Sequence, residues 1–159
     1  MSLIKAENVN KDYRVVAKKI GRVLFICTRN SSRSQMAEAL VNHGLAGSFE
    51  AFSAGTEPSF VNPLAIAVMQ ELGIDISQKR SKGLEEFAGQ KFDYVITLCS
   101  QADETCPVFF GGTQKIHMGF PDPAGFTGTD AEKLGAFRKV RDQIREQVIG
   151  YLVNPKGRE

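Results

Sequence analysis

The residues most suited to chemistry in this chain are a cysteine and an arginine in one short loop. Cys27 and Arg33 lie in "CTRNSSRS", residues 27–34. The loop follows an apolar run and precedes a segment with helical spacing. A loop of this kind turns backbone N–H groups toward one point, and the helix N-terminus adds unpaired donors and a positive dipole end. Arg33 adds a planar fork that matches two oxygens of a tetrahedral oxyanion.

The loop therefore predicts an oxyanion site with a nucleophile in it. The positive field favours thiolate over thiol at Cys27. Ser34 can donate its hydroxyl to the sulfur, and Asn30 tolerates the left-handed backbone that a tight loop needs. A buried cysteine before a polar turn is the alternative, which the Ser- and Asn-rich composition disfavours. We predict Cys27, Arg33 and Ser34 as catalytic, and as oxyanion-binding Thr28, Arg29, Asn30, Ser31, Ser32, Arg33 and Ser34.

The other two cysteines lie close together, in "LCSQADETCPVF". Cys99 and Cys106 are seven positions apart in a polar segment, which we expect to be exposed. Two thiols can deliver two electrons by forming one disulfide, which hydrolysis of a phosphate ester does not require. Two unconnected loop cysteines are the alternative. An odd number of cysteines argues against the disulfide framework of a secreted protein.

The elements that must position these residues follow from hydrophobic periodicity. Strands are predicted at 22–26, 49–54, 92–98 and 115–120, and helices after the loop to about residue 43, at 62–73, and behind a capping box at Thr129. Such alternation predicts an α/β fold: a three-layer α/β/α domain around a parallel four-stranded sheet, with helices on both faces. Ligands bind at the carboxyl ends of such strands. Cys27 and Cys99 both follow strands, so we expect them on the same rim.

Composition restricts the classes of partner. The 159 residues fit one domain, here residues 21–153, with an N-terminal extension (1–20) and a C-terminal tail (154–159). The net charge is +2 with scattered basic residues, which predicts no nucleic-acid binding. No apolar run approaches the length of a membrane span, and no signal peptide is evident, so we expect a cytoplasmic protein. Nothing demands a dimer, and we expect a monomer.

These motifs resemble a known family. The loop is similar to that of the low-molecular-weight protein tyrosine phosphatases and of the thioredoxin-coupled arsenate reductases built on the same fold. The resemblance covers roughly residues 21–152 and implies a flavodoxin-like topology. "NSSRSQMAEA" and "TLCSQADETCP" are close to the reductase branch.

By this resemblance, Cys27 is the nucleophile, Arg33 holds the oxyanion, and Asp122 of "GFPDPAG" is the general acid. Cys27 would attack arsenate, for which phosphate or sulfate are mimics. Cys99 would then attack the adduct and release arsenite, and Cys106 would resolve the disulfide. Electrons would come from thioredoxin or another thiol donor. No bound cofactor and no metal are implied.

Two other functions compete with this interpretation. A tyrosine phosphatase shares the first half of the chemistry, but such enzymes usually carry an aromatic residue after the Asp-Pro, where this chain has Ala124 and Gly125. A non-enzymatic anion sensor would use the loop for binding alone and would need neither the cysteine pair nor the acid.

The chain departs from the family pattern at three positions, one of which is Ser32, where many members carry a second loop cysteine. Arg29 stands where the family usually has Gly, which adds positive charge and is expected to demand an unusual backbone. Some reductases bind potassium with residues that match Asn30, Glu38 and Ser53, but Lys82 replaces the remaining aspartate ligand. Our hypothesis is that the Lys82 ammonium substitutes for the ion.

Overall fold

Four parallel strands form the central sheet of the computed structural model, which describes residues 20–100 and 111–155. The strand order is β2-β1-β3-β4, and each neighbouring pair is parallel. This confirms the predicted α/β class and its four-stranded parallel sheet. The strands are β1 (Gly21–Cys27), β2 (Phe49–Gly55), β3 (Phe92–Thr97) and β4 (Gly112–His117).

The central strand β1 is buried on both faces, as its continuous apolar run predicts. Val23 and Phe25 belong to the larger hydrophobic core, whereas Leu24 and Ile26 belong to the smaller one. Alternate residues of a strand point to opposite faces, so the two cores lie on opposite sides of the sheet.

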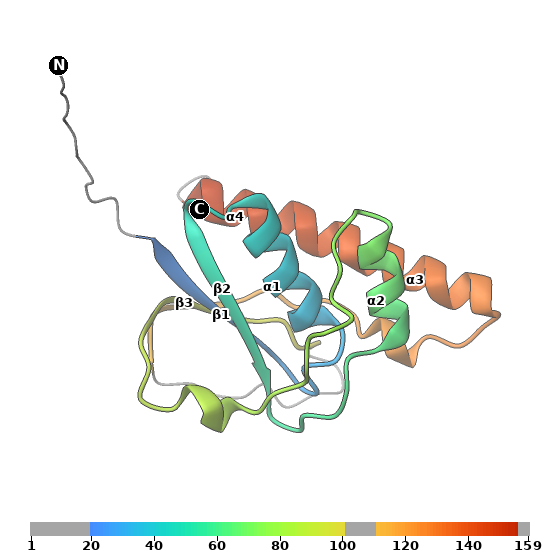
Figure 1. Cartoon of the computed structure of the whole chain (residues 1–159), viewed down its shortest axis with the longest axis horizontal. Coiled ribbons are helices and arrows are strands. Elements are labelled where there is room, and N and C mark those ends of the chain that lie inside the picture. The colour runs from blue at the N-terminus through green and yellow to red at the C-terminus, as the bar shows by residue number, and fades with distance from the viewer. Residues whose placement is uncertain (1–19, 101–110, 156–159) are drawn as a thin grey trace, which may run out of the picture.

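The α-helices α1 (Arg33–Gly44), α2 (Pro63–Gln70) and α3 (Asp130–Ile144) supply side chains to the larger core and lie together over one face of the sheet (Figure 1). A π-helical turn, η3 (Arg145–Ile149), and α4 (Gly150–Val153) continue α3. On the other face, the 3-10 helix η1 (Leu84–Phe87) packs Phe87 against Phe52 and Phe92.

Local signals set the helix boundaries. Thr129 and Glu132 form the predicted capping box at the start of α3, with both hydrogen bonds present. Asn62 caps α2, which ends at Gln70 rather than near residue 73. The strand β4 begins at Gly112, three residues earlier than predicted, because backbone pairing with β3 extends beyond the apolar residues.

The chain adds β2 on one side of β1 and β3 on the other, so the topological switch point of the sheet lies between β1 and β3. Cys27 is the last residue of β1, and the amide of Leu98 donates to the carbonyl of Ile26 at 2.8 Å. The segment after β3 therefore continues beside β1, and Cys99 follows on the same rim as Cys27, as predicted. Residues 1–19, 101–110 and 156–159, including Cys106, lie outside the described residues.

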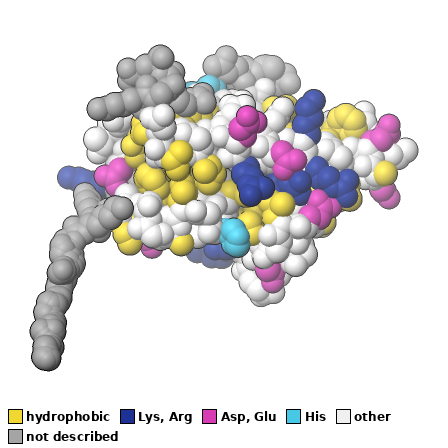
Figure 2. Space-filling model, turned by 90° about the horizontal axis from the view of Figure 1, so that it is seen from above, with side chains coloured by type: hydrophobic (Ala, Val, Ile, Leu, Met, Phe, Trp, Pro, Cys, Tyr) yellow, Lys and Arg dark blue, Asp and Glu magenta, His cyan; other side chains and the backbone are white. Residues whose placement is uncertain are grey.

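Surface charge is mixed on the face seen in Figure 2, where Lys and Arg side chains alternate with Asp and Glu. The surface also contains ion pairs, such as that of Arg138 with Glu71 at 2.8 Å. In the part of the chain that the structure describes, no helix has the length and apolar character needed to cross a membrane.

Candidate active site

The backbone of the loop at residues 27–34 is held by neighbouring segments. The carbonyls of Thr28 and Ser31 accept from the amides of Glu57 (2.8 Å) and Asn62 (3.0 Å). The carbonyl of Arg29 accepts from the hydroxyl of Ser81, at 2.7 Å. These partners all follow β2, so the loop between β1 and α1 is fixed by residues distant in sequence.

Asn30 is the centre of a buried hydrogen-bond network. Its φ of 50° is the left-handed conformation that the sequence predicts for a tight loop here. Its side-chain NH2 donates to Ser34 Oγ at 2.8 Å. Its side-chain oxygen accepts from Gln35 Nε2 (2.9 Å) and from the backbone amide of Lys82 (2.8 Å). The side chain therefore locks the loop to the first turn of α1 and to residue 82.

Ser34 connects this network to Cys27. Ser34 Oγ lies 2.9 Å from Cys27 Sγ, and both residues are buried. Asn30 donates to Ser34 Oγ, so the hydroxyl proton of Ser34 is free to be donated to the sulfur when Cys27 is a thiolate, which can only accept. A donated hydrogen bond stabilises a thiolate at Cys27.

The N-terminus of α1 has the features of an anion site. Its first internal hydrogen bond runs from Met36 N to Ser32 O, so the amides of Ser34 and Gln35 make none within the helix. No acidic residue neutralises the first turn. Ser32 Oγ is buried with no hydrogen-bond partner among the described residues. These donors and the helix dipole favour a bound anion.

Arg33 connects this loop to the predicted acid. Its guanidinium is buried, donates to the carbonyl of Phe120 at 3.2 Å, and lies 3.7 Å from a carboxylate oxygen of Asp122. The Asp122 side chain is 46% exposed and accepts from the amide of Ala124 at 3.0 Å. The structure thus brings Cys27, Ser34, Arg33 and Asp122 to one rim of the sheet.

Cys99 lies on this rim as well, but it is not in an exposed position. Both Cys27 and Cys99 are thiols, and Cys99 is fully buried. The expectation of an exposed segment is therefore wrong at Cys99, because the chain still runs beside β1 there through the Leu98 hydrogen bond. Cys106 lies outside the described residues.

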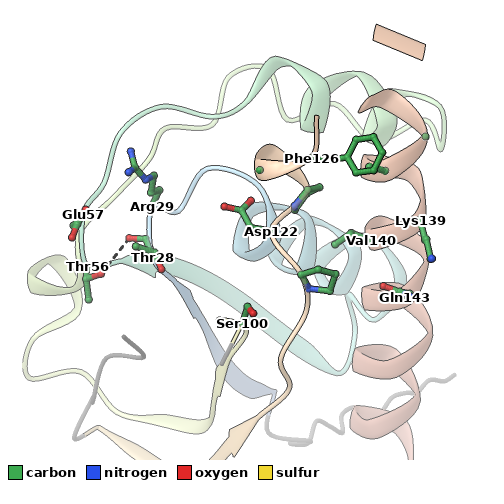
Figure 3. Close-up of a pocket in the computed structure, with 15 residues that line it drawn as sticks. Thr28, Arg29, Thr56, Glu57, Ser100, Asp122, Phe126, Lys139, Val140 and Gln143 are labelled. Carbon is green, nitrogen blue, oxygen red and sulfur yellow. Dashed lines mark hydrogen bonds between the residues drawn. The ribbon is translucent and has the colours of Figure 1, made fainter. Parts of the chain in front are cut away.

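A large cavity opens over the loop (Figure 3). Its volume is about 1260 Å³, far larger than one tetrahedral oxyanion, and its lining includes Thr28, Arg29, Asp122 and Phe126. The sequence did not predict Phe126 as a site residue, because aromatic residues were expected only at the two positions directly after Asp122-Pro123. The sequence signal that could have identified it is an aromatic residue four positions after Asp122, in the same turn, and in the structure its side chain is 46% exposed.

The sequence of this chain is similar to those of known proteins. The sequence model of one protein family, described as low molecular weight phosphotyrosine protein phosphatase, matches residues 22–157. The chain belongs to the low molecular weight phosphotyrosine protein phosphatase family.

Individual relatives refine this assignment. An arsenate reductase from Halalkalibacterium halodurans is 44% identical over 126 residues, which cover 79% of this chain and 91% of that protein. A solved arsenate reductase in the phosphate binding state has 37% identity and a TM-score of 0.72, over 84% of this chain and 98% of that one. A thioredoxin-dependent arsenate reductase from Corynebacterium glutamicum has 30% identity and a TM-score of 0.58, over 87% of this chain and 65% of that one.

One lysine, Lys82, lies behind the loop among oxygen atoms. Lys82 Nζ lies 3.4 Å from both Asn30 Oδ1 and Ser53 Oγ, 3.2 Å from the carbonyl of Arg80, and 3.8 Å from Glu38 Oε1. Burial is the largest influence on the pKa of Lys82 and lowers it, while Glu38 opposes this effect. The ammonium is thus surrounded by oxygens in the manner that our substitution hypothesis requires. Among the described residues, no three His, Cys, Asp or Glu side chains are grouped to hold a metal.

The backbone conformation at Arg29 differs from the one expected from the sequence. An unusual backbone was expected at this position, where the family usually has Gly. Among the described non-glycine residues, a positive φ occurs at Asn30 and not at Arg29. The turn is made one residue later than the expected position, so arginine is accommodated without backbone strain.

Proposed function

We propose that this protein reduces arsenate to arsenite. Cys27 is the nucleophile, Arg33 and the loop amides hold the oxyanion, and Asp122 is the general acid. Cys99 and Cys106 form the disulfide relay. The observation that supports this proposal best is the position of a second thiol, Cys99, on the same rim as Cys27. The names of the relatives support arsenate as the substrate.

The first step is displacement at arsenic. The Cys27 thiolate attacks the arsenic atom, and an oxygen leaves as water after accepting a proton from Asp122. The buried guanidinium of Arg33 and the amides at the start of α1 neutralise the negative charge of the anion throughout. The product is a Cys27–arsenic adduct that still contains arsenic(V).

The second step transfers two electrons. The thiolate of Cys99 attacks Cys27 Sγ, the sulfur–arsenic bond breaks, and its electron pair stays on arsenic, which leaves as arsenite. A Cys27–Cys99 disulfide remains. Cys106 then attacks Cys99 and frees Cys27, and a dithiol reductant converts the Cys99–Cys106 disulfide back to thiols while becoming a disulfide itself. The thioredoxin-dependent relative supports a thioredoxin-like donor.

Burial of Cys99 implies movement in the second step. A disulfide needs the two Cα atoms within about 4.4–6.8 Å, and the attack requires that the sulfurs meet. Cys99 is held where it is by the continuation of β3 beside β1. We therefore expect this segment to leave its packed position once the adduct has formed.

Phosphate-ester hydrolysis is the second candidate function, and one structural observation favours it. Phe126 lines the cavity and supplies the aromatic surface that the sequence lacks directly after Asp122-Pro123. A phosphorylated aromatic ring can pack on such a surface. The same nucleophile, arginine and acid would serve both reactions.

Parallel assays separate these functions. Arsenate-dependent consumption of reducing equivalents is followed with thioredoxin and thioredoxin reductase, and release of the phenol from an aryl phosphate is followed in the same preparation. The proposal expects Cys99→Ser and Cys106→Ser to stop multiple turnover of arsenate. Both variants should keep aryl-phosphate hydrolysis within about tenfold of the parent protein. Arsenate turnover at the parent rate in Cys106→Ser would refute the relay, and the phosphatase function would replace it.

A further inference from the structure

The loop at residues 27–34 contains two arginines in opposite environments. Arg33 is buried and paired with Asp122. Arg29 is exposed, and none of the described carboxylates forms an ion pair with its guanidinium. Arg29 nevertheless lines the cavity above Cys27, together with Thr28 and Asp122. A positive charge with no counter-ion among the described carboxylates therefore lies at the entrance to the oxyanion site.

Neighbouring segments hold the backbone around Arg29, which fixes the place on the cavity wall from which the side chain extends. The Arg29 carbonyl is bound by Ser81 Oγ at 2.7 Å. Gly55 packs so closely that a Cβ there would lie 2.6 Å from Thr28 O and 3.0 Å from the carbonyl carbon of Arg29. Figure 3 shows the Arg29 side chain rising from the loop on the side of Glu57, with Asp122 across the cavity.

We propose that Arg29 is a specificity-determining residue that attracts doubly charged oxyanions into the cavity before Arg33 binds them. This inference deepens the proposed function and rests on it for the identity of the substrate. Arsenate and phosphate carry up to two negative charges near neutral pH. A cation in a cleft with low-dielectric walls raises the local concentration of such anions and the rate of their capture.

The charge of Arg29 acts against two acidic groups that line the same cavity, Glu57 and Asp122. Lys139, on α3, adds a positive charge on the far wall. Because Glu57 forms no ion pair with a described cation, its carboxylate repels an approaching anion. Removal of Arg29 and removal of the Glu57 charge should therefore have opposite effects on anion capture.

A role of Arg29 in anion capture and a role in the chemical step predict different changes in kcat and kcat/KM. If Arg29 acts before binding, Arg29→Ala lowers kcat/KM for arsenate about threefold to tenfold at low salt and leaves kcat nearly unchanged. The loss should shrink to less than about twofold at an ionic strength near 1 M, where the Debye length is about 3 Å. Arg29→Lys keeps the charge and should keep most of the effect.

A matched control removes one positive charge elsewhere. Lys91 is exposed immediately before β3, at the opposite end of the strands from the loop, and its backbone carbonyl accepts from Arg22. Lys91→Ala should therefore leave kcat/KM within about 1.5-fold of the parent value at both salt concentrations. Circular dichroism and the melting temperature verify folding of each variant.

A second measurement does not depend on arsenate at all. Cys27 is alkylated with iodoacetate, an anion, and with iodoacetamide, a neutral analogue, and the Cys27 peptide is quantified by mass spectrometry. The ratio of the two rates cancels changes in the reactivity of the sulfur itself. Arg29→Ala should lower this ratio at least about threefold at low salt, and Glu57→Gln should raise it.

The outcomes are distinct. An unchanged alkylation ratio in Arg29→Ala at low salt would overturn the role of Arg29, as would a loss that is equally large at high salt. A parent protein that fails to reduce arsenate would refute the proposed function instead. The alkylation ratio would still decide whether Arg29 selects anions.

Discussion

The loop at residues 27–34 and the segment at residues 122–126 meet at one site but are held in different ways. In the first, Asn30, Ser34 and Gln35 are fully buried, and Asn30 and Gln35 are bonded to the backbone of Lys82 and Arg80, beyond β2. In the second, Asp122 is 46% exposed, and the hydrogen bonds of residues 122–126 are local, such as Phe126 N to Pro123 O at 3.2 Å. Distant contacts fix the anion site, whereas local turns position the acid.

This difference corresponds to two tasks. Donors that stabilise negative charge work best when they need no rearrangement at the moment of reaction, so their loop is rigid. A proton donor must approach the leaving oxygen and then allow the product to escape. Exposed segments with local hydrogen bonds open at low free-energy cost, which suits this second task. Substitutions at Cys27, Asp122, Gly55 and Lys82 test this division.

The largest effect is expected at the nucleophile in the rigid loop. Cys27→Ser should lower both arsenate reduction and aryl-phosphate hydrolysis by at least about a thousandfold, because an unactivated hydroxyl is a poor nucleophile. The melting temperature should change by only a few degrees, since the side chains have similar size. Assays of both activities and a thermal unfolding scan test this prediction. Hydrolysis that survives in Cys27→Ser would remove Cys27 from the mechanism.

The acid in the exposed segment should matter for rate and not for binding. Asp122→Asn is expected to lower kcat about a hundredfold to ten-thousandfold, the usual contribution of a positioned general acid. Phosphate should inhibit this variant as strongly as the parent protein or more strongly, because a negative charge near Arg33 is lost. Steady-state kinetics with phosphate as competitor measure both quantities. Weaker phosphate inhibition would mean that Asp122 organises the anion site.

A single methyl group should disturb the rigid loop. In Gly55→Ala, the new Cβ would lie 2.6 Å from Thr28 O and 2.7 Å from Asn30 N, so backbone must move. We expect a loss of about 1–3 kcal/mol in unfolding free energy and a lower kcat/KM. In the control, Gly47→Ala, the Cβ meets nothing within 4 Å, and a change within about 0.5 kcal/mol is expected. Urea unfolding of both variants tests this contrast, and equal stabilities would contradict it.

Prediction from sequence succeeds where the physical cause is local. The apolar run of β1, the strand–loop–helix junction at Cys27 and the capping box at Thr129 each depend on neighbouring residues, and the structure contains all three elements. The left-handed conformation of Asn30 belongs to this group, since it follows from loop length and residue type.

Features that depend on the path of the chain could not be predicted. The partners of the loop carbonyls, Glu57, Asn62 and Ser81, are polar residues without any pattern, and the crossover after β2 brings them to the loop. Burial of Cys99 depends on how far β3 continues beside β1, which its polar surroundings in sequence obscure. The sequence therefore predicts the reactive groups better than the contacts that hold them.

The smallest effect is expected behind the rigid loop, at Lys82. Lys82→Ala removes the ammonium from Asn30 Oδ1, Ser53 Oγ and Glu38, but Asn30 Oδ1 keeps its bonds to Gln35 and to the backbone of residue 82. We therefore expect kcat/KM to fall only about twofold to tenfold, with potassium chloride restoring more of it than sodium chloride. Lys79→Ala is the matched control, since Lys79 is 3.3 Å from the same carboxylate but is 44% exposed.

The pH dependence of the unfolding free energy tests whether burial lowers the pKa of Lys82. Because burial lowers the pKa of Lys82, the unfolded chain binds more protons than the folded chain in the interval just below the usual lysine pKa. In that interval, the contribution of Lys82 to the unfolding free energy rises with pH. Lys82→Ala should remove this rise, and Lys79→Ala should retain it. Denaturant unfolding at a series of alkaline pH values measures the difference. Identical curves for the parent and Lys82→Ala would refute the lowered pKa of Lys82. Absence of any effect of potassium on the activity of Lys82→Ala would show that the ammonium does not take the place of an ion behind the loop.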